Sequence, residues 1–458
     1  MSRYSSRSKQ VDDSSGWSSA GLQQTHFSVT PGSPQDVLRK EQFRVFTGTW
    51  NVGGKLPQEK MNLEDWLRLT TPADIYVIGF QEIVPLNAGN VLGVDDKCSA
   101  MRWLHLIQKA LNKKSSPVKT ATFPHKLSPK RKSHSLCSGR MDEPFTAEEY
   151  HNVDLRSSTI SERGSLHKSL CGPQHISSLQ SHSSNEANIS TGAIGVPIHL
   201  PPPAVKSCCG GDAERTLQYA LVASKQMVGI LLSVWVRDDL GRYVQHVNIS
   251  SVRCGVMGYL GNKGSISISL RLHQTTFCFI CSHLTSGEKE GDELRRNCDV
   301  NVILKRTYFS TRLKGSLPHT ILEHDHVLWI GDLNYRLALP STSMKSLLAR
   351  RDWDALLERD QLHIERTAGR VFKGWHEGKI CFPPTYKYRT GSDTYAVERR
   401  KFGQKRRTPA WCDRILWYGN GLKQLEYVRA ESSFSDHRPV YAVFLAEVVP
   451  KKLKDFLV

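Results

Sequence analysis

The chain has 458 residues, and 62 Lys and Arg against 44 Asp and Glu give it a net charge of +18. The length is ample for a large core, and the basic balance indicates polyanionic partners: phosphorylated metabolites, nucleic acid or an acidic membrane surface. No apolar run approaches the roughly 20 residues of a membrane-spanning helix, and eleven irregularly spaced cysteines exclude a disulfide framework. Because the N-terminal residues also have no apolar signal segment, we expect an intracellular protein.

The first predicted elements follow a polar, Ser-rich segment, residues 1–40, which we expect to be a disordered leader. Apolar stretches predict strands at 43–50 and 73–80. Apolar residues at helical spacing predict helices at 61–69 and 99–112. The chain therefore begins with strands and helices in alternation.

Residues 113–213 have a different composition, rich in Ser, His, Lys and Pro and poor in spaced apolar side chains. Such a stretch buries too little surface to offset the entropy of ordering it. We therefore predict a disordered insertion within the domain. Its basic run Pro129-Lys-Arg-Lys132 fits a nuclear address, a lipid-binding patch or an ordinary solvated charge cluster.

Ordered sequence is expected again from about Leu217. Ile266, Ile268 and Leu270 alternate with Ser, which is the period of a half-buried strand. The later elements predicted are strands at 228–237, 264–271, 276–282, 327–331, 425–430 and 440–445, and helices at 288–311 and 343–361. Because several strands follow one another directly, we predict an α/β sandwich with mixed or antiparallel sheets. Residues 448–458 are a basic tail.

Polar groups that can bind metal or carry protons stand at the ends of successive predicted strands. They are Asn51, Gln81, Glu82, His283, Asp332, Asn334, Asp436 and His437. One Asn or Glu at a strand end is more often a turn residue, by roughly 3 to 1, and a lone His is usually structural. Such groups beside five apolar strands are harder to dismiss, because strand ends along one rim let distant segments meet at one substrate.

The kinds of side chain in this set indicate a chemistry. A carboxylate with an Asn amide and water suits Mg²⁺, which takes oxygen ligands. Two histidines and a second carboxylate suit the positioning of a water and the stabilisation of phosphoryl charge. We therefore expect a Mg²⁺ cofactor and phosphoester hydrolysis.

Six blocks of sequence closely resemble the inositol polyphosphate 5-phosphatases of the endonuclease/exonuclease/phosphatase superfamily. They are Thr49-Trp-Asn-Val52, Gln81-Glu82, Ser282-His-Leu284, Trp329-Ile-Gly-Asp-Leu-Asn-Tyr-Arg336, Pro409-Ala-Trp-Cys-Asp-Arg-Ile-Leu416 and Ser435-Asp-His-Arg-Pro439. The fourth and fifth blocks are specific to that branch, whereas the last is shared with nucleases. The resemblance is greatest to plant type I enzymes and places a catalytic domain at 41–447, interrupted by the insertion. It implies a four-layer α/β/β/α sandwich of the deoxyribonuclease I-like type.

The resemblance implies Mg²⁺-dependent removal of the 5-phosphate from Ins(1,4,5)P3, PtdIns(4,5)P2 and PtdIns(3,4,5)P3 by direct attack of water. It implies that Glu82 is the principal Mg²⁺ ligand and that Asn51 lies close to the metal. Asp332 is expected to orient or deprotonate the water. Which group takes the proton from the water stays open.

The remaining polar groups are expected to handle the phosphoryl group. Asn334 is expected to steady it, and His283 and His437 to donate hydrogen bonds to its oxygens. The resemblance places Asp436 in the metal shell or behind His437, which a carboxylate is expected to orient.

Basic and aromatic residues near the site are predicted to bind the ring phosphates. They are Lys263, Tyr386, Lys387, Lys405, Arg336 and Arg414. The first lies in a Gly-flanked loop from which it can reach a phosphate, and the next three match family positions that recognise a 4-phosphate. The two arginines fit either substrate contacts or structural ion pairs. Arg389 stands where the family often has an acidic residue, which leaves the fine substrate preference open.

Two other functions compete with this prediction. A nuclease of the same superfamily would suit the positive charge, but the Trp-Cys-Asp-Arg block and the Tyr-Lys-Tyr loop match phosphatases, so we expect no nucleic-acid partner. An inactive lipid-binding module would have lost groups such as Glu82, Asp332 or His437, and all are present. We expect a monomeric enzyme of the cytoplasm and the cytosolic membrane surface, in transient contact with acidic lipids, with a nuclear fraction compatible with the basic run.

Overall fold

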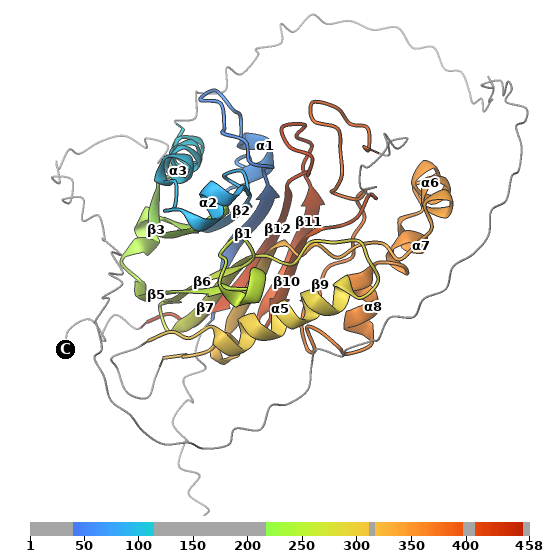
Figure 1. Cartoon of the computed structure of the whole chain (residues 1–458). Helices are drawn as coiled ribbons and strands as arrows, with labels where there is room; N and C mark the ends of the chain where they lie inside the picture. The colour runs from blue at the N-terminus through green and yellow to red at the C-terminus, as the bar shows by residue number, and fades with distance from the viewer. Residues whose placement is uncertain (1–39, 114–216, 311–316, 397–407, 452–458) are drawn as a thin grey trace, which may run out of the picture. The chain divides into compact units, whose positions relative to one another are not determined.

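The structure is a computed structural model that describes residues 40–113, 217–310, 317–396 and 408–451. Nearly all of the predicted leader and insertion, most of the predicted tail, and Lys405 lie outside these ranges, so the predictions made for them stay predictions. The described residues form two six-stranded sheets (Figure 1).

Sheet A joins the first strands of the chain to the last. Its order is β11-β12-β1-β2-β4-β3, in which β1 and β2 are parallel and the other neighbours are antiparallel. Its strands are β1 (Glu41–Asn51), β2 (Ile75–Gln81), β3 (Tyr219–Met227), β4 (Ile230–Arg237), β11 (Leu422–Arg429) and β12 (Val440–Val448).

Sheet B is built in the same way around its own parallel pair. Its order is β5-β6-β7-β8-β10-β9, in which only β7 and β8 are parallel. Its strands are β5 (Val244–Arg253), β6 (Gly264–Leu272), β7 (Thr275–His283), β8 (His326–Asp332), β9 (His376–Glu377) and β10 (Asp413–Tyr418).

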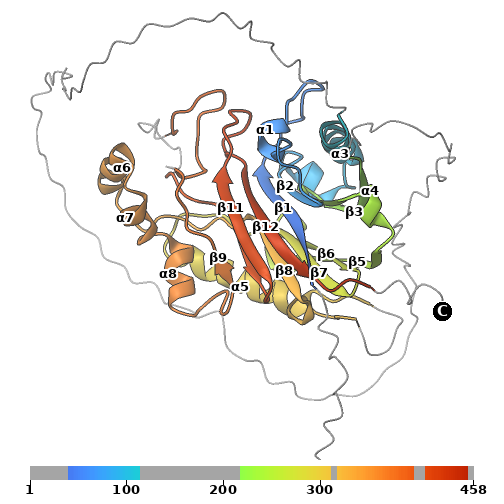
Figure 2. The same cartoon turned by 180° about the vertical axis from the view of Figure 1, so that it is seen from behind.

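The strands carry apolar side chains on both faces, and successive side chains point to opposite faces. The apolar inner faces of the two sheets therefore pack against each other, and the outer faces are left for the helices. In β8, Leu328 and Ile330 belong to the core between the sheets, whereas Val327 and Trp329 belong to a core outside sheet B. Helix α3 packs on the outer face of sheet A and α5 on the outer face of sheet B. Figures 1 and 2 show the strands between α1–α3 on one side and α5 and α8 on the other. The expected four-layer α/β/β/α sandwich is confirmed.

Apart from α3, which has about the predicted length, the predicted helices are shorter in the structure or divided. The described helices are α1 (Glu64–Leu67), α2 (Ala88–Leu92), α3 (Lys97–Leu111), α4 (Asp238–Gly241), α5 (Asp292–Arg306), α6 (Ser341–Arg350), α7 (Trp353–Leu357) and α8 (Gln361–Thr367), with short 3₁₀ turns η1 (Val256–Gly258) and η2 (Ile321–Glu323). The helix predicted at 343–361 is divided, because Asp352 and Asp360 cap the starts of α7 and α8 with their carboxylates. None of the described helices is long and apolar enough to cross a membrane.

Four strands, β3, β5, β9 and β10, were not predicted from the sequence. β3, β5 and β9 lie at edges of their sheets, where one side of a strand needs no partner and the apolar pattern is weak. β10 is short, and its residues were assigned to a motif rather than to an element.

The described chain stops at Lys113 and resumes at Leu217 beside the same point of the domain. The Asn112 side chain donates to the carbonyl oxygen of Tyr219 (3.0 Å) and accepts from its backbone N–H (2.7 Å). These two hydrogen bonds join the end of α3 to the start of β3.

Candidate active site

The candidate site lies where the facing surfaces of the two sheets reach one edge of the sandwich. Along β7, Phe279 and Cys281 point into the core between the sheets, and His283 continues the same row. Along β8, Ile330 points into that core and Asp332 is next in the row. Because side chains alternate with period two, the last inward position of each strand places a polar group at the edge.

The strand register aligns polar residues across sheet B. His283 pairs with Asp332 across β7 and β8, and Asp332 pairs with Asp413 across β8 and β10. In sheet A, Asn51 ends β1 and Glu82 directly follows β2. The contacts described next show that these two groups meet in space.

Two carboxylates converge on Asn51. Its amide nitrogen donates to Glu82 Oε1 (3.2 Å) and to Asp332 Oδ2 (2.9 Å), and its Oδ1 accepts from the Gly53 N–H (3.0 Å). Glu82 has φ +55°, which is uncommon for a side chain other than glycine and often marks a functional position. Asn51 thus lies beside Glu82, with its nitrogen rather than its oxygen facing the carboxylates.

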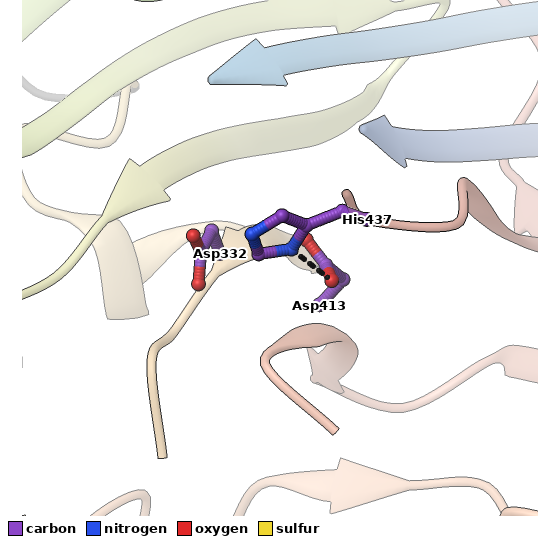
Figure 3. Close-up of side chains that lie close together, drawn as sticks. All are labelled: Asp332, Asp413 and His437. Atoms are coloured by element: carbon purple, nitrogen blue, oxygen red, sulfur yellow. Dashed lines mark hydrogen bonds and ion pairs between the residues drawn. The ribbon is translucent and has the colours of Figure 1, made fainter. Parts of the chain in front are cut away.

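His437 is oriented by Asp413, a residue that the sequence analysis did not select. His437 Nδ1 lies 2.8 Å from Asp413 Oδ2, which also accepts from Thr385 Oγ1 (2.6 Å). Figure 3 shows the ring with Asp413 on one side and Asp332 on the other. The available signal was an acidic residue inside the apolar Trp-Cys-Asp-Arg block, which was used only to identify the family.

Burial and charge act in opposite directions on this group. Burial disfavours the imidazolium of His437, but the charge of Asp413, the hydrogen bond to it and the charge of Asp332 outweigh burial and raise the pKa to about 9. Burial raises the pKa of Asp332, although the charge of His437 opposes this shift. A protonated His437 can donate a hydrogen bond from Nε2, because Nδ1 is engaged by Asp413.

His283 lies between a lysine and the two carboxylates. Its Nε2 contacts Lys263 Nζ and lies 3.4 Å from Asp332 Oδ2 and 3.8 Å from Glu82 Oε1. Burial lowers the pKa of Lys263 to about 8, although the charges of Asp332 and Glu82 oppose the shift. Burial and the charge of Lys263 hold the pKa of His283 well below its ordinary value, so His283 is neutral at pH 7.

Asn334 and Arg336 form a layer behind Asp332. The Asn334 N–H donates to Asp332 Oδ1 (3.1 Å), and its Oδ1 accepts from Arg336 Nη2 (2.6 Å). Arg336 also donates to Glu288 (3.2 Å), and its side chain is only 4% exposed. Asn334 has φ +57°, which turns the chain sharply after β8. Asn334 and Arg336 therefore lie next to the site, and their hydrogen bonds run to Asp332, to each other and to Glu288.

Tyr386, Lys387 and Asp436 form another wall of the site. The Tyr386 ring lies 4.5 Å from the His437 ring and 4.6 Å from the guanidinium of Arg336. Lys387 Nζ pairs with Asp436 Oδ2 (3.1 Å), and both side chains are partly exposed. Although burial opposes the shift, the charges of His437 and Lys387 lower the pKa of Asp436.

Arg414 faces away from the site, which corrects its assignment to substrate binding. It follows Asp413 on β10, and successive side chains of a strand point to opposite faces. Its guanidinium donates to both oxygens of Glu377 (2.7 and 2.9 Å) and to Asp360 (2.8 Å), and the side chain is 1% exposed. A buried cation with two carboxylate partners is the structural ion pair that the sequence had left open.

Two groups of side chains were tested as metal sites. Ligand atoms of Asp332, Asp413 and His437 all lie within 4.8 Å of one another, but a protonated His437 whose Nδ1 is held by Asp413 is a poor ligand. Glu82 and Asp332 bring two carboxylate oxygens to one amide, and Glu82 is 29% exposed. Hard oxygen donors next to solvent fit a divalent cation such as Mg²⁺ or Ca²⁺.

Comparison with known families and proteins agrees with this architecture. Residues 48–138 and 204–443 match the Endonuclease/Exonuclease/phosphatase family 2. Type I inositol polyphosphate 5-phosphatase 8 of Arabidopsis thaliana is 47% identical over 433 residues, which cover 94% of this chain and 77% of that protein. Type IV inositol polyphosphate 5-phosphatase 7 of Arabidopsis thaliana is 45% identical over 475 residues, which cover 90% and 80%.

Two solved structures have the same fold as this chain. The inositol polyphosphate 5-phosphatase domain of SpSynaptojanin, in complex with inositol (1,4)-bisphosphate and calcium ion, matches with a TM-score of 0.60 and 25% identity over 91% of this chain and 88% of that one. Cimex nitrophorin, at 17% identity and a TM-score of 0.51, shares the fold, with 89% of this chain and 99% of that one covered. The chain belongs to the endonuclease/exonuclease/phosphatase family and, within it, to the inositol polyphosphate 5-phosphatases.

Proposed function

We propose that this enzyme hydrolyses the 5-phosphate of Ins(1,4,5)P3, PtdIns(4,5)P2 and PtdIns(3,4,5)P3 with Mg²⁺, and so attenuates phosphoinositide signalling. The observation that carries the proposal is the convergence of Glu82, Asp332, His283 and His437 at one edge of the sandwich, beside Lys263. Phosphoryl transfer needs a positioned water and neutralised charge rather than covalent chemistry from the protein. These side chains can supply both.

Glu82 is the proposed Mg²⁺ ligand, and Asn51 holds its carboxylate close to that of Asp332. Bound Mg²⁺ supplies positive charge that offsets phosphate charge and makes water easier to deprotonate. Asp332 orients the attacking water or takes its proton. The raised pKa of Asp332 supports the second role, because a stronger base accepts a proton more readily.

The two histidines are the proposed hydrogen-bond donors to the phosphoryl oxygens. Asp413 leaves Nε2 of His437 free to point at the substrate and holds the ring protonated. Lys263 adds positive charge beside His283. Asn334 acts through Asp332, to which its backbone N–H donates.

Ring phosphates other than the reacting one would bind along the Tyr386–Lys387 wall. Lys387 is partly exposed and is held only by Asp436 among the ion pairs of the described residues, so a 4-phosphate can replace that carboxylate. Inositol (1,4)-bisphosphate, present in the SpSynaptojanin complex, is what remains when Ins(1,4,5)P3 loses its 5-phosphate. This supports the same product here. Lys405, which lies outside the described residues, is also proposed to bind substrate, on the sequence resemblance alone.

A phosphocysteine intermediate is the alternative to direct attack by water. Cys209 and Arg215 have the Cys-x5-Arg spacing of cysteine-dependent phosphatases, and both lie outside the described residues. The site built from carboxylates and imidazoles favours water as the nucleophile. A Cys209→Ser variant should therefore keep full activity, whereas a cysteine-dependent enzyme would lose it.

Lipid substrates require contact with a membrane surface, and we propose that this contact is transient. Val256 and Tyr259 are 67% and 75% exposed shortly before Lys263, and Leu92 and Val94 are 73% and 93% exposed in the segment after β2. Apolar side chains near a basic site suit shallow binding to an acidic interface. We propose a monomer of the cytoplasm and the cytosolic membrane surface, with a nuclear fraction addressed by the basic run.

The decisive experiment measures phosphate release from Ins(1,4,5)P3 and from vesicles containing PtdIns(4,5)P2, with Mg²⁺ and with EDTA. The matched control is Asp332→Asn, which keeps the shape of the side chain and removes its charge. We expect Mg²⁺-dependent release that the control lacks, with the 4-phosphate retained in the product.

Other outcomes would redirect the proposal. Release with EDTA present would remove the role assigned to Mg²⁺. No release from either substrate, together with nicking of plasmid DNA, would favour a nuclease. Release from Ins(1,4,5)P3 alone would remove the lipid substrates and, with them, the reason for membrane contact.

A further inference from the structure

The guanidinium of Arg414 is the centre of a buried ion network behind the site. Besides its bonds to Glu377 and Asp360, it donates to the carbonyl oxygen of Trp411 (3.3 Å). Glu377 in turn accepts from Arg366 (3.0 Å) and from the Tyr427 hydroxyl (3.2 Å). Two ion pairs to one guanidinium, with carboxylate partners 0% and 5% exposed, fix the geometry of a cation far more tightly than a surface pair does.

The first arm of the network controls β10. Arg414 is the residue after Asp413. The two hydrogen bonds from its guanidinium to the carboxylate of Glu377 in β9 therefore help to fix the position of β10, the strand that carries Asp413. The backbone N–H of Ile415, the next residue, is held by the Tyr427 hydroxyl (3.2 Å). The contacts of Arg414 and Ile415 therefore hold the backbone at Asp413 in place, on the side of the sheet opposite to His437.

The second arm controls the segment that follows Asp332. Asp360 caps α8, and its neighbour Gln361 donates its backbone N–H to the carbonyl oxygen of Arg336 (2.9 Å). Gln361 Oε1 accepts from the Arg336 N–H (2.9 Å). Arg336 in turn donates to Asn334. The buried Arg414–Asp360 ion pair is therefore connected, through Gln361 and Arg336, to the segment that follows Asp332.

We propose that Arg414 is a positioning residue for the reaction. Through Glu377 and Asp360 it holds Asp413 against His437, and Asn334 against Asp332. The inference rests on the proposed roles of His437 and Asp332, and it assigns a task in turnover to a side chain that the substrate does not touch.

The test is a double-mutant cycle on kcat between Arg414→Lys and Asp413→Asn, with Ins(1,4,5)P3 as substrate and the full chain as enzyme. Lysine keeps the charge but lacks the fork that engages both carboxylates. All variants are compared at a temperature at which near-ultraviolet circular dichroism shows a native fold. The matched control is Arg237→Lys, which alters an Arg–Asp pair with Asp74 at the far end of sheet A.

We expect Arg414→Lys to lower kcat about 10-fold to 100-fold with KM within about twofold, because a misplacement of about 1 Å can cost that much. In the Asp413→Asn background the same change should lower kcat clearly less than it does in the wild type, because the part of its effect that acts through Asp413 is already lost and only the part that acts through Asn334 remains. Arg237→Lys should lower the melting temperature without changing kcat.

Equal losses in both backgrounds would overturn the proposal that Arg414 acts through Asp413. An unchanged kcat with a lowered melting temperature would overturn the positioning role altogether and leave Arg414 purely structural. Full activity of Asp413→Asn alone would instead remove the underlying role of His437 and Asp413. If Arg414→Lys does not fold, Glu377→Gln, which keeps the side-chain shape and removes one charge, enters the same cycle with the same expectations.

Discussion

His437 Nδ1 and Asp413 Oδ2 lie 2.8 Å apart, and the two side chains are 6% and 0% exposed. The carboxylate accepts a hydrogen bond from Thr385 Oγ1 (2.6 Å), and the backbone N–H of Asp413 donates to the same hydroxyl oxygen (3.4 Å). The pair therefore sets both the direction of the imidazole and its protonation state, two properties that a hydrogen-bond donor to phosphate needs at once.

Replacing Asp413 by Asn should shift the pH profile as well as the rate. His437 donates only when protonated, so kcat/KM falls as pH rises through its pKa of about 9. Removing the charge of Asp413 lowers that pKa, so the alkaline loss of activity should begin at lower pH. We expect kcat/KM at pH 7 to fall about 10²-fold to 10⁴-fold. Thr385→Val, which keeps the carboxylate, should shift the profile less; identical profiles for wild type and Asp413→Asn would contradict this role.

Gly331→Ala should damage the site through the backbone. Gly331 has φ +149°, and a Cβ there would lie 2.1 Å from the carbonyl oxygen of Ser282. The added methyl would force β7 and β8 apart next to His283 and Asp332. We expect a loss of about 2–4 kcal/mol in the free energy of unfolding and a larger loss of turnover than that destabilisation explains, measured by urea unfolding and phosphate release.

Gly369→Ala is the matched control for this change. Gly369 also has a positive φ, +67°, but a Cβ there meets no atom within 4 Å. It should cost only about 1–2 kcal/mol, the strain of the left-handed backbone. Equal effects of the two substitutions would show that contact with β7 does not matter.

A divalent cation should stabilise the fold independently of activity. Glu82 and Asp332 bring negative charge together around Asn51, so binding of Mg²⁺ should relieve their repulsion. We expect saturating Mg²⁺ to raise the melting temperature of the EDTA-treated protein, and Glu82→Gln to abolish the shift. Glu358→Gln, at an exposed position, should keep it. A shift retained in Glu82→Gln would move the metal to the Asp332, Asp413 and His437 group.

Mild acid should destabilise the protein through two buried histidines, His324 just before β8 and His326 at its start. Burial lowers the pKa of His324 and of His326, so both are neutral in the folded state. In the unfolded chain they titrate near pH 6.5, so the unfolded state takes up protons first. Their contribution is fully present above about pH 6.5 and is lost as pH falls towards the folded pKa values.

The free energy of unfolding in urea should therefore drop between pH 7.5 and pH 5.5, by less than about 1.4 kcal/mol for each histidine, the limit set by the one pH unit between 6.5 and 5.5. His324→Gln should be less stable at pH 7.5, because the ring bonds Ser269 and the carbonyl oxygens of Thr320 and Ile321, but its pH dependence should be weaker. The exposed His363→Gln is the control. An unchanged slope in His324→Gln would assign the acid sensitivity to other groups.

The sequence predicted the part of the site that stands at the ends of apolar strands. Asn51, Glu82, His283 and Asp332 interrupt apolar runs, and a polar residue in that place is visible without a structure. These residues meet only because the two sheets pack with their inward-facing side chains aligned. The apolar pattern predicts that arrangement only if a two-sheet sandwich is already assumed.

Asp413 and Arg414 show what the sequence could not decide. They are adjacent charged residues in one block, and only the register of β10 determines that the first faces the site and the second faces Glu377. A one-residue shift in that strand would exchange their roles. The helix predicted over 343–361 failed for a related reason, because the pattern of apolar residues continued while Asp352 and Asp360 acted as caps rather than as exposed helix residues.

The hydrogen bonds between Asn112 and Tyr219 have a consequence for how members of this family can differ in length. They hold residues 112 and 219, which are more than 100 positions apart in the sequence, at one point on the rim of sheet A. The entropic cost of closing a loop rises only by about 0.6 kcal/mol for each doubling of its length. The number of residues between these two points can therefore differ among relatives at small cost to the stability of the folded domain.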